Sequence, residues 1–390
     1  MPRLTGHIVS GDDIFTAQVG VLMRSGGVPV SVMGDGRLHD GASTPDLVVV
    51  DGRGDAAFAI GRVEELRNGS PSAAIFMVTA ESTPELILQS MRAGANEFRT
   101  WPVEPRALED AIRRAAARRA TLPGAKPRAS TMVFLGAKGG AGTTTIAMNC
   151  AVEMSLLDKR STVLVDLKAG LGEVALFAGV RNSYGIIDAL DNLHRLDAEF
   201  LRELLVRHKS GLEVLAGSDQ FDRPAPADSP AVEEIFRLLA QRYDHILVDA
   251  GCQVNACVVP VLYEADAIFV IANPDVPSVR NAQRLIERIR KLGPCSEHVR
   301  VVLNRASPDH SIPTPQIETA LGYPVYQSFP SDYKTVAGAL NSGTPLSMAG
   351  RSEMSRKFAQ FTKRILDPSI DAASNGGRSR PLFGRLAAFW

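Results

Sequence analysis

The feature that most constrains this chain is a glycine-rich loop near its middle, Val133-Phe-Leu-Gly-Ala-Lys138-Gly-Gly-Ala-Gly142-Thr-Thr-Thr145. It predicts a short apolar strand, a tight turn and the first turn of a helix. Glycines let several backbone N–H groups point at one place, and with the helix N-terminus they form a cradle for a phosphate. Thr144 would offer its hydroxyl to a magnesium ion on the phosphates.

The loop departs from the usual phosphate-loop pattern, G-x-x-x-x-G-K-[ST]. Ala137 stands in place of the first glycine and Thr143 in place of the lysine, and the loop's own lysine, Lys138, comes early. The loop alone therefore does not establish whether it binds a nucleotide or whether it supports catalysis, and the rest of the sequence is needed for both questions.

Length and composition predict a multidomain globular protein. The chain has 390 residues, enough for two or three domains, and its 45% hydrophobic and 22% charged residues are ordinary for a globular fold. Lys plus Arg and Asp plus Glu are both 43, so we expect no specific nucleic-acid partner. No apolar run reaches about 18 residues, and the N-terminus lacks a signal peptide's apolar core.

The cysteines indicate a reducing compartment. Cys150, Cys252, Cys257 and Cys295 form no CxxC pair and have no nearby histidine. We expect reduced, mostly buried thiols of a cytosolic protein rather than a zinc site.

Residues 1–119 predict an α/β domain in which strands alternate with helices. Leu47–Asp51 is a continuous apolar run that ends in an acid, as in a central parallel strand buried on both faces. The alternation indicates a doubly wound parallel sheet. We expect strands at 7–10, 28–33, 47–51, 74–79 and 97–100, and helices at 14–25, 57–68, 82–93 and 105–119.

A Pro- and Gly-containing linker, residues 120–130, separates this domain from a second α/β domain at 131–366. Its expected strands after the loop strand are 161–166, 212–216, 245–249, 267–272 and 299–304, and its expected helices are 146–157, 230–242, 279–292 and an interrupted helical region at 187–209. Residues 367–390 form a disordered linker and a short apolar tail. Residues 381–390 are either a membrane-surface or partner-docking helix or a frayed end.

The first domain resembles a response-regulator receiver domain, which has a flavodoxin-like fold. Asp51 matches the phosphoacceptor position and Thr79 the hydroxyl position, but Trp101 replaces the family's lysine, and the acidic pair Asp12-Asp13 is displaced. The resemblance implies a receiver fold kept for docking or dimerisation, with Asp51 not phosphorylated. Control by phosphorylation of Asp51 is the alternative.

The second domain resembles the MinD/ParA ATPases, whose deviant phosphate loop reads K-G-G-x-G-K-T-T and is matched from Lys138 except at Thr143. The resemblance implies a P-loop NTPase fold and a face-to-face homodimer with two ATP molecules, in which Lys138 crosses to the partner's nucleotide. The loop Ser328–Asp332 matches the segment that closes over the base. The implied nucleotide-binding residues are Lys138, Gly139, Gly140, Ala141, Gly142, Thr143, Thr144, Thr145, Asn304, Arg305 and Pro330.

Magnesium and catalysis follow from the same resemblance. Thr144 and, through water, Asp249 would hold Mg²⁺. Asp166 ends the strand before the first switch region and is a weak catalytic candidate. Lys168 replaces the aspartate that positions the attacking water, and Thr143 replaces the loop lysine, so we expect hydrolysis to be slow or absent. Lys168 either supplies the charge that Thr143 lacks or is a solvated surface lysine.

The domain combination resembles the TadZ/CpaE proteins of Tad (Flp) pilus assembly. The stretches Ser183–Asp197, His208–Ala216 and Ala339–Leu346 are similar to that group. The resemblance implies a cytoplasmic, dimeric, ATP- and Mg²⁺-binding localisation factor at a cell pole near the inner membrane. Expected partners are other pilus assembly proteins, such as a secretion ATPase or inner-membrane components, and the membrane surface through the C-terminal tail. The alternative is a cycling MinD/ParA-type ATPase for septum or DNA positioning.

Overall fold

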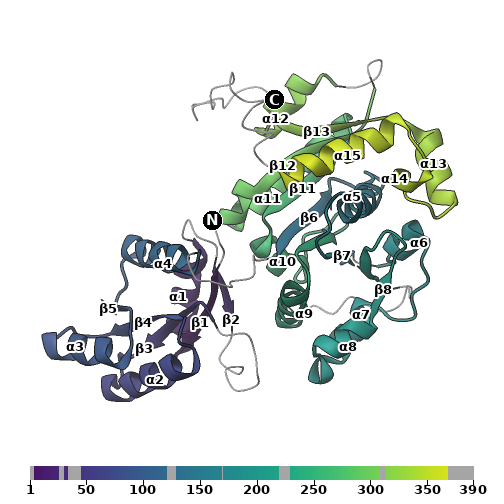
Figure 1. Ribbon diagram of the computed structural model, residues 1–390. Helices are drawn as coiled ribbons and strands as arrows, with labels where there is room; N and C mark the ends of the chain where they lie inside the picture. Colours follow the sequence, from purple (N-terminus) through teal and green to yellow (C-terminus); the bar gives the residue numbers. More distant parts are fainter. Residues whose placement is uncertain are drawn as a thin grey trace.

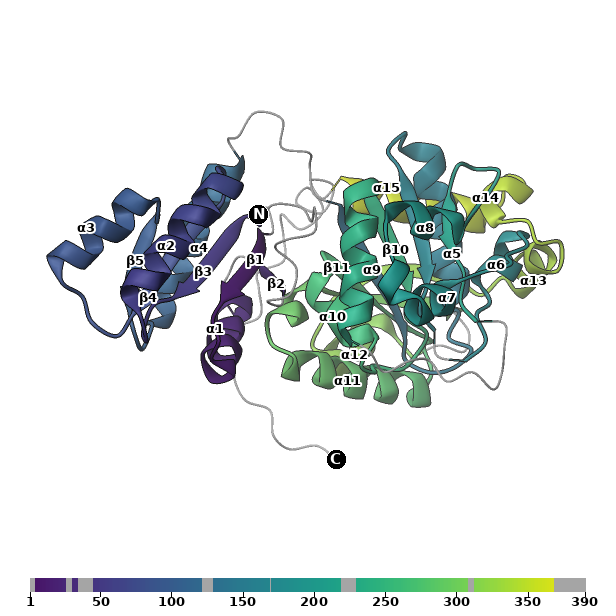
Figure 2. The same cartoon turned by 90° about the horizontal axis from the view of Figure 1, so that it is seen from below.

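The computed structural model describes residues 4–25, 30–33, 45–120, 129–168, 170–218, 229–307 and 312–367. These residues form a five-stranded and an eight-stranded sheet, which appear as separate lobes in Figures 1 and 2. Both sheets are parallel apart from one edge strand, so the predicted α/β class is confirmed. The domain boundaries at 119, 130 and 366 remain predictions.

The N-terminal sheet has the strand order β2-β1-β3-β4-β5, and all of its strand pairs are parallel. In sheets of this order, ligand sites lie beyond the carboxyl ends of the strands, where the order reverses between β1 and β3. The strands are β1 (Leu4–Val9), β2 (Val30–Met33), β3 (Leu47–Asp51), β4 (Ala74–Thr79) and β5 (Glu97–Thr100), and the helices are α1 (Asp13–Ser25), α2 (Ala56–Gly69), α3 (Pro84–Ala93) and α4 (Pro105–Ala120).

Each face of this sheet has its own core. Phe15 of α1 and Leu108 of α4 pack with strand residues on one face, and Val63 of α2 packs with Val48 and Ile75 on the other. Because successive strand residues point to opposite faces, the all-apolar run of β3 supplies both cores. That double burial explains why the boundaries predicted for β3 and β4 match the observed ones.

The eight-stranded sheet has the order β13-β12-β11-β6-β10-β7-β9-β8, with only the β8–β9 pair antiparallel. β6 lies near its centre, between β11 and β10, so the loop that follows β6 opens at the middle of the carboxyl edge. The strands are β6 (Ser130–Gly136), β7 (Thr162–Asp166), β8 (Leu205–Arg207), β9 (Glu213–Leu215), β10 (His245–Asp249), β11 (Ala267–Ala272), β12 (Val299–Ala306) and β13 (Val325–Pro330).

Helices cover both faces of this sheet (Figure 1). One layer contains α5 (Thr143–Leu157), α6 (Val174–Ala178), α13 (Tyr333–Asn341), α14 (Leu346–Ala349) and α15 (Glu353–Leu366). The other contains α7 (Ile186–Asp191), α8 (Ala198–Glu203), α9 (Ser229–Arg242), α10 (Val258–Glu264), α11 (Val276–Lys291) and α12 (Thr314–Leu321). Two short 3₁₀ helices, η2 (Leu193–Arg195) and η3 (Pro294–His298), complete the described elements.

The first helical layer is held by an aromatic core. Phe269 of β11 stacks on Phe134 of β6 with ring centroids 5.0 Å apart, and Phe361 of α15 meets Phe269 edge-on at 5.1 Å. All three side chains are almost completely buried, and each burial stabilises the fold by about 1.5–3 kcal/mol. This core fixes α15 against the strands next to the glycine loop.

The first strand begins and ends earlier than the predicted range 7–10, at Leu4–Val9, and two further expectations are wrong in the type of element. The helical region predicted at 187–209 ends earlier, because residues Leu205–Arg207 form β8 and pair with β9 at the sheet edge. The predicted base-closing loop Ser328–Asp332 is partly strand, since β13 runs to Pro330 and pairs with β12. In both places pairing with another strand decides the conformation, which the periodicity of the segment itself does not reveal.

The remaining expectations concern cysteines, membranes and the termini. Cys150, Cys257 and Cys295 are buried and Cys252 is exposed, so the prediction of mostly buried cysteines is confirmed. Within the described ranges, no helix has the length and apolar character needed to cross a membrane. Residues 121–128 of the predicted linker and the predicted tail at 381–390 lie outside the described residues.

Candidate functional site

The glycine loop joins β6 to α5 and has the backbone that its sequence predicts. Gly140 and Gly142 have φ values of 76° and 94°, a left-handed conformation that favours glycine. Gly142 is the N-cap residue of α5, so the free N–H groups of the first helical turn face the loop. A Cβ added at Gly136 would lie 2.3 Å from Thr143 Oγ1. The close return of the chain onto β6 therefore requires glycine at position 136.

Thr144 and Asp249 meet beside this loop. The hydroxyl of Thr144 donates a hydrogen bond of 2.5 Å to Oδ2 of Asp249, and both residues are buried. Asp166 is the register partner of Asp249 on the neighbouring strand. Its carboxylate accepts hydrogen bonds from the backbone N–H groups of Lys168, at 3.3 Å, and Val174, at 3.1 Å. The two predicted acids thus lie side by side at one strand edge.

The two carboxylates disfavour each other's ionisation. Burial, and then the nearby charge of Asp249, raise the pKa of Asp166 to about 7. Burial also raises the pKa of Asp249, although the donors Thr144 and Gly251 oppose that shift. A cation placed at this edge would relieve the cost of the buried charges.

The residues at this edge fit a Mg²⁺ ion that is carried by phosphates. Hydroxyl and carboxylate oxygens, here from Thr144 and Asp249, are ligands that Mg²⁺ prefers, and the ion usually keeps several waters. Among the described residues there is no cluster of three or more His, Cys, Asp or Glu side chains suited to a metal ion. Bound phosphate and water would therefore have to complete the coordination.

Lys138 points away from this cluster, toward the start of α11. Its Nζ lies 3.1 Å from Oδ2 and 3.2 Å from Oδ1 of Asp275, and the two side chains are 33% and 41% exposed. Asp275 is also the N-cap of α11, where Oδ1 accepts from the backbone N–H of Ser278 at 2.8 Å. Lys138 is thus held within its own chain, at the rim of the loop.

Lys168 lies on the opposite side of the loop, beside Gly251. A Cβ added at Gly251 would be 3.0 Å from Cγ of Lys168, and the Lys168 ammonium donates to Glu173 Oε2 at 2.5 Å. Burial works against the charged form of Lys168, but Glu173, Asp166 and Asp249 outweigh it and raise the pKa of this lysine. Lys168 is therefore a fixed positive charge within the field of both buried acids.

The residues that are predicted to contact the nucleotide base lie on the side of the loop away from Lys168. Asn304, near the end of β12, donates from Nδ2 to the carbonyl of Ala141 at 2.8 Å. Arg305 has a φ of 58° and is the only non-glycine residue in the described part of the chain with positive φ. Such strain concentrates at functional sites. Pro330 pairs with Ala306 on the adjacent strand, so the structure brings Asn304, Arg305 and Pro330 together.

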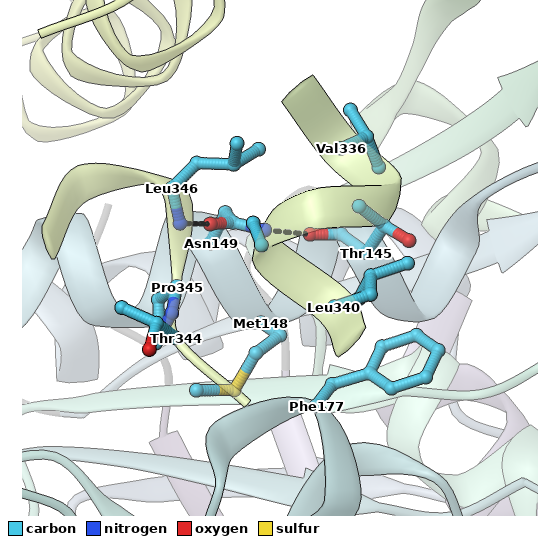
Figure 3. Close-up of a pocket in the computed structure, with 10 residues that line it drawn as sticks. Thr145, Met148, Asn149, Phe177, Val336, Leu340, Thr344, Pro345 and Leu346 are labelled. Atoms are coloured by element: carbon cyan, nitrogen blue, oxygen red, sulfur yellow. Dashed lines mark hydrogen bonds between the residues drawn. The ribbon is translucent and has the colours of Figure 1, made fainter. Parts of the chain in front are cut away.

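Thr145 faces a small cavity behind the loop (Figure 3). The cavity measures about 10 Å³, which is the space of one water molecule and far below that of a nucleotide base. Asn149 spans its wall, donating to the Thr145 carbonyl at 2.8 Å and accepting from the Leu346 N–H at 2.7 Å. This contact joins the loop helix to α14, and we assign it a structural role.

Sequence reasoning did not identify the partners of the two lysines. Asp275 and Glu173 belong to Asn273-Pro-Asp-Val-Pro-Ser278 and Gly172-Glu-Val. The first has the form of an N-cap before a helix, so a capping acid after β11 was visible in the sequence. Its contact with Lys138 spans 137 positions, and no local pattern gives such a pairing.

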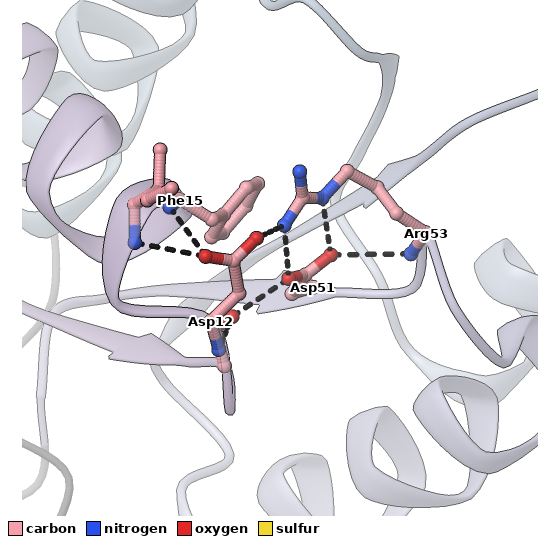
Figure 4. A network of polar contacts seen from close by, with 6 residues as sticks. Asp12, Phe15, Asp51 and Arg53 are labelled. Atoms are coloured by element: carbon pink, nitrogen blue, oxygen red, sulfur yellow. Dashed lines mark hydrogen bonds and ion pairs between the residues drawn. The ribbon is translucent and has the colours of Figure 1, made fainter.

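Asp51 lies at the carboxyl edge of the other sheet and belongs to a separate cluster with Asp12 and Arg53 (Figure 4). Burial opposes ionisation of Asp51, but hydrogen bonds from Arg53 and Ser10 outweigh it and keep the pKa of the Asp51 carboxyl below its usual value. Thr79 is buried at the end of β4 and donates to the carbonyl of Glu81 at 2.7 Å.

The chain is similar to proteins named septum site-determining protein MinD. It is 26% identical to that of Thermotoga maritima over 247 residues, covering 60% of this chain and 88% of the relative. It is 24% identical to that of Helicobacter pylori over 246 residues, covering 60% and 89%. The protein of the same name from Bacillus subtilis is 22% identical over 270 residues, covering 66% and 97%. No family model matches the chain.

Solved structures share the fold. A ParA family ATPase from Chlorobium tepidum superposes with a TM-score of 0.58 at 23% identity, covering 61% of this chain and 98% of that one. MinD from Pyrococcus horikoshii complexed with Mg-ADP gives 0.54 at 18% identity, covering 62% and 97%. The MinC:MinD complex of Aquifex aeolicus gives 0.53 at 23% identity, covering 66% and 99%.

These similarities show the fold of the second domain, an α/β parallel-sheet P-loop fold of the ParA/MinD type. The chain is homologous to MinD/ParA-family ATPases over about 60% of its length.

Proposed function

We propose that the chain binds ATP and Mg²⁺ at the glycine loop, holds them across a homodimer interface and hydrolyses ATP slowly or not at all. The observation that carries this proposal is that one sheet edge combines a glycine-rich phosphate loop with altered charges. The Thr144–Asp249 pair is present, whereas Thr143 stands where a lysine is expected and Lys168 where an acid is expected.

Each part of the edge has a role in this proposal. Residues Gly139–Thr145 present backbone N–H groups to the phosphates. Thr144 and, through water, Asp249 hold Mg²⁺, which neutralises charge on the phosphates. Asn304, Arg305 and Pro330 receive the base. Lys138 reaches the nucleotide of the partner subunit.

Slow turnover follows from the charges that remain. Thr143 is buried against Gly136, and its hydroxyl is neutral, so it does not stabilise charge that develops on the phosphates. Lys168 is a cation and therefore does not orient or deprotonate an attacking water. Losing one such electrostatic contact typically costs a factor of about 100 or more in rate. Both carboxylate oxygens of Asp166 accept backbone N–H groups, from Lys168 and Val174, and we assign this residue to organising the loop that follows β7.

We further propose that Lys168 supplies the positive charge that Thr143 lacks. Replacing Lys168 by Ala is expected to weaken ATP binding by about tenfold to about 150-fold, since a charged hydrogen bond contributes about 1.5–3 kcal/mol. Calorimetric titration of ATP with Mg²⁺ measures this change, and the exposed Lys159→Ala is the matched control. An unchanged affinity for Lys168→Ala would identify Lys168 as a solvated surface lysine.

The interface that we propose surrounds the loop. Three apolar side chains near the residues described above are exposed: Leu176 at 71%, Val276 at 68% and Tyr333 at 83%. Val276 follows Asp275, the residue that holds Lys138. A second copy that covers this edge would remove these side chains from water and would bring its own Lys138 close to the loop.

The proposed division of the chain assigns residues 1–119 to a receiver-like docking or dimerising domain and 131–366 to the ATP-binding domain. Residues 120–130 and 367–390 are the proposed linkers, the latter ending in the apolar tail. The order β2-β1-β3-β4-β5 supports the first assignment, because receiver domains share it with flavodoxin-like folds.

For the whole chain we propose a localisation factor for Tad pilus assembly at the cell pole, with ATP as a ligand that favours the dimer. The similarity of residues 183–197, 208–216 and 339–346 to the TadZ/CpaE group supports this role. Imaging a fluorescent fusion and counting pili test it. Polar foci and loss of pili on deletion are expected, whereas uniform fluorescence with normal pili would refute the role.

The second candidate is a cycling ATPase that positions a septum or DNA, favoured by the names of the MinD and ParA relatives. Phosphate release by the purified protein separates the two functions. Clear turnover that Asp249→Ala abolishes would favour the cycling ATPase. We expect no release above the background given by Asp249→Ala.

A further inference from the structure

One arginine joins the loops after β1 and β3 at the carboxyl edge of the N-terminal sheet (Figure 4). Arg53, two residues after β3, donates from Nε to Asp51 Oδ1 and from Nη2 to Asp51 Oδ2, both at 2.9 Å. The same Nη2 donates to Asp12 Oδ2 at 2.7 Å. The guanidinium carbon lies 4.4 Å from the ring centroid of Phe15 and 4.8 Å from that of Trp101.

The acceptor capacity of Asp51 is already filled. Its Oδ1 accepts from the backbone N–H of Arg53, at 3.1 Å, and from Nε of the same residue. Its Oδ2 accepts from Nη2 and from the hydroxyl of Ser10, the latter at 2.6 Å. An ionised carboxylate has about four lone-pair sites, so none remains for a metal ion or an incoming phosphoryl group.

Asp12 is occupied in the same way. Its Oδ1 accepts from the backbone N–H groups of Ile14, at 2.8 Å, and Phe15, at 3.3 Å, at the start of α1. Its Oδ2 accepts from Arg53. Asp12 and Asp51, two of the carboxylates that a receiver-like site would offer to Mg²⁺, are therefore committed to one guanidinium.

The charge and position of Arg53 decide what this site accepts. The side chain of Arg53 is 21% exposed and that of Asp51 11%, so the pair is largely shielded from solvent. A guanidinium stays protonated in proteins and matches a carboxylate bidentately. A divalent cation at the same carboxylates would have to displace a neighbouring positive charge that lies over two aromatic rings in mutual contact, Phe15 and Trp101. The residues present do not fit a Mg²⁺ ion.

We propose that Arg53 is a built-in cation that occupies the carboxylate site of the N-terminal sheet, closes it to divalent metal ions and holds the loops after β1, β3 and β5 in one arrangement. Asp51 is then an anchor of this clamp and not a phosphoacceptor. Removing the guanidinium uncovers a divalent-cation site formed by Asp12 and Asp51.

The test counts Mn²⁺ ions bound by the full chain, without nucleotide, by electron paramagnetic resonance. The samples are the wild type, Asp51→Asn, Arg53→Ala, Arg53→Gln and the double variant Arg53→Ala/Asp51→Asn. Arg62→Ala, an α2 arginine paired with Glu65, is the matched control. Circular dichroism establishes which variants fold. Trp101 reports the location of the ion, because Mn²⁺ bound beside it quenches its fluorescence.

Wild type, Asp51→Asn and Arg62→Ala are expected to bind the same amount of Mn²⁺. Arg53→Ala and Arg53→Gln are expected to bind about one more ion per chain, with quenching, and the double variant to lose it. A loss of Mn²⁺ in Asp51→Asn relative to wild type would overturn the proposal, as would folded Arg53 variants that gain no ion. If neither Arg53 variant folds, two measurements still test the proposal. These are the Mn²⁺ binding of Asp51→Asn compared with wild type, and the labelling of the wild type by acetyl phosphate. Phosphorylation of wild-type Asp51 by acetyl phosphate in the presence of Mg²⁺ would refute the closed site, and an absence of labelling would support it.

Discussion

Replacing Asp275 by Asn is expected to strengthen ATP-dependent dimerisation. The proposed dimer requires Lys138 to leave Asp275 and reach the partner's nucleotide, so the ion pair within each chain competes with assembly. Both side chains are about one-third exposed or more, and such pairs contribute about 0.2–1 kcal/mol. A symmetric dimer breaks two of them, about 0.4–2 kcal/mol in total. The dimer dissociation constant should therefore fall about twofold to thirtyfold.

The Asp275→Asn change is chosen because it leaves the helix cap in place. Asn is as good an N-cap as Asp, so the bond from the Ser278 N–H is retained and only the charge is lost. Asp197→Asn, at the N-cap of α8, is the matched control, because the Asp197 carboxylate accepts from backbone N–H groups of its own helix, those of Glu199 and Phe200.

Sedimentation velocity with Mg²⁺ and a non-hydrolysable ATP analogue measures the dissociation constant. Salt should narrow the difference between wild type and Asp275→Asn, because it screens exposed charges. An unchanged or weaker dimer in a folded Asp275→Asn protein would refute the idea that Asp275 holds Lys138 back.

Three further predictions concern the same sheet edge. Gly142→Ala should abolish ATP binding in calorimetry, because φ is 94° and the new Cβ would lie 2.2 Å from Nδ2 of Asn304; retained affinity would contradict the described loop. Val276→Asp should leave the melting temperature unchanged, since Val276 is 68% exposed, but prevent dimerisation in light scattering; a normal dimer would place the interface elsewhere. The pKa of Asp166 is raised to about 7, so the native protein keeps a proton that the unfolded chain releases above about pH 4. The free energy of unfolding of the nucleotide-free protein should therefore fall as pH rises from about 4 to 7. Asp166→Asn should flatten that part of the melting-temperature profile, and an equal slope would refute this cause.

The sequence predicts those elements best that are buried on both faces. The boundaries of β3, β4, β10 and β11 match their predicted ranges, because continuous apolar runs that end at polar residues leave little choice of register. The three residues of β8 carry no such signal. Leu205-Val-Arg207 fits the end of a helix equally well, and only its pairing with β9 makes it a strand.

In the candidate site, too, some contacts follow from the sequence pattern and others depend on packing between loops. Thr144 and Asp249 were both expected at the phosphate loop, and they are hydrogen-bonded there, since the carboxyl ends of parallel strands must converge. The partners of Lys138, Lys168 and Asp51 were not predicted. Lysine and arginine side chains are long, and which acid each one reaches depends on packing between loops. Arg53 lies only two residues from Asp51, yet its role depends on Phe15 from α1 and on Trp101 from the loop after β5.

The central claim is that the glycine loop holds ATP across a dimer of this chain with little turnover. Its most direct test is the solution mass of the full chain, measured by light scattering with and without ATP and Mg²⁺ over several hours. We predict a monomer without nucleotide, a dimer with ATP and Mg²⁺ that persists throughout, and a monomer for Lys138→Ala under both conditions. A solution mass that does not change when ATP is added, a dimer that dissociates as ATP is consumed, or a normal dimer for Lys138→Ala would contradict the account.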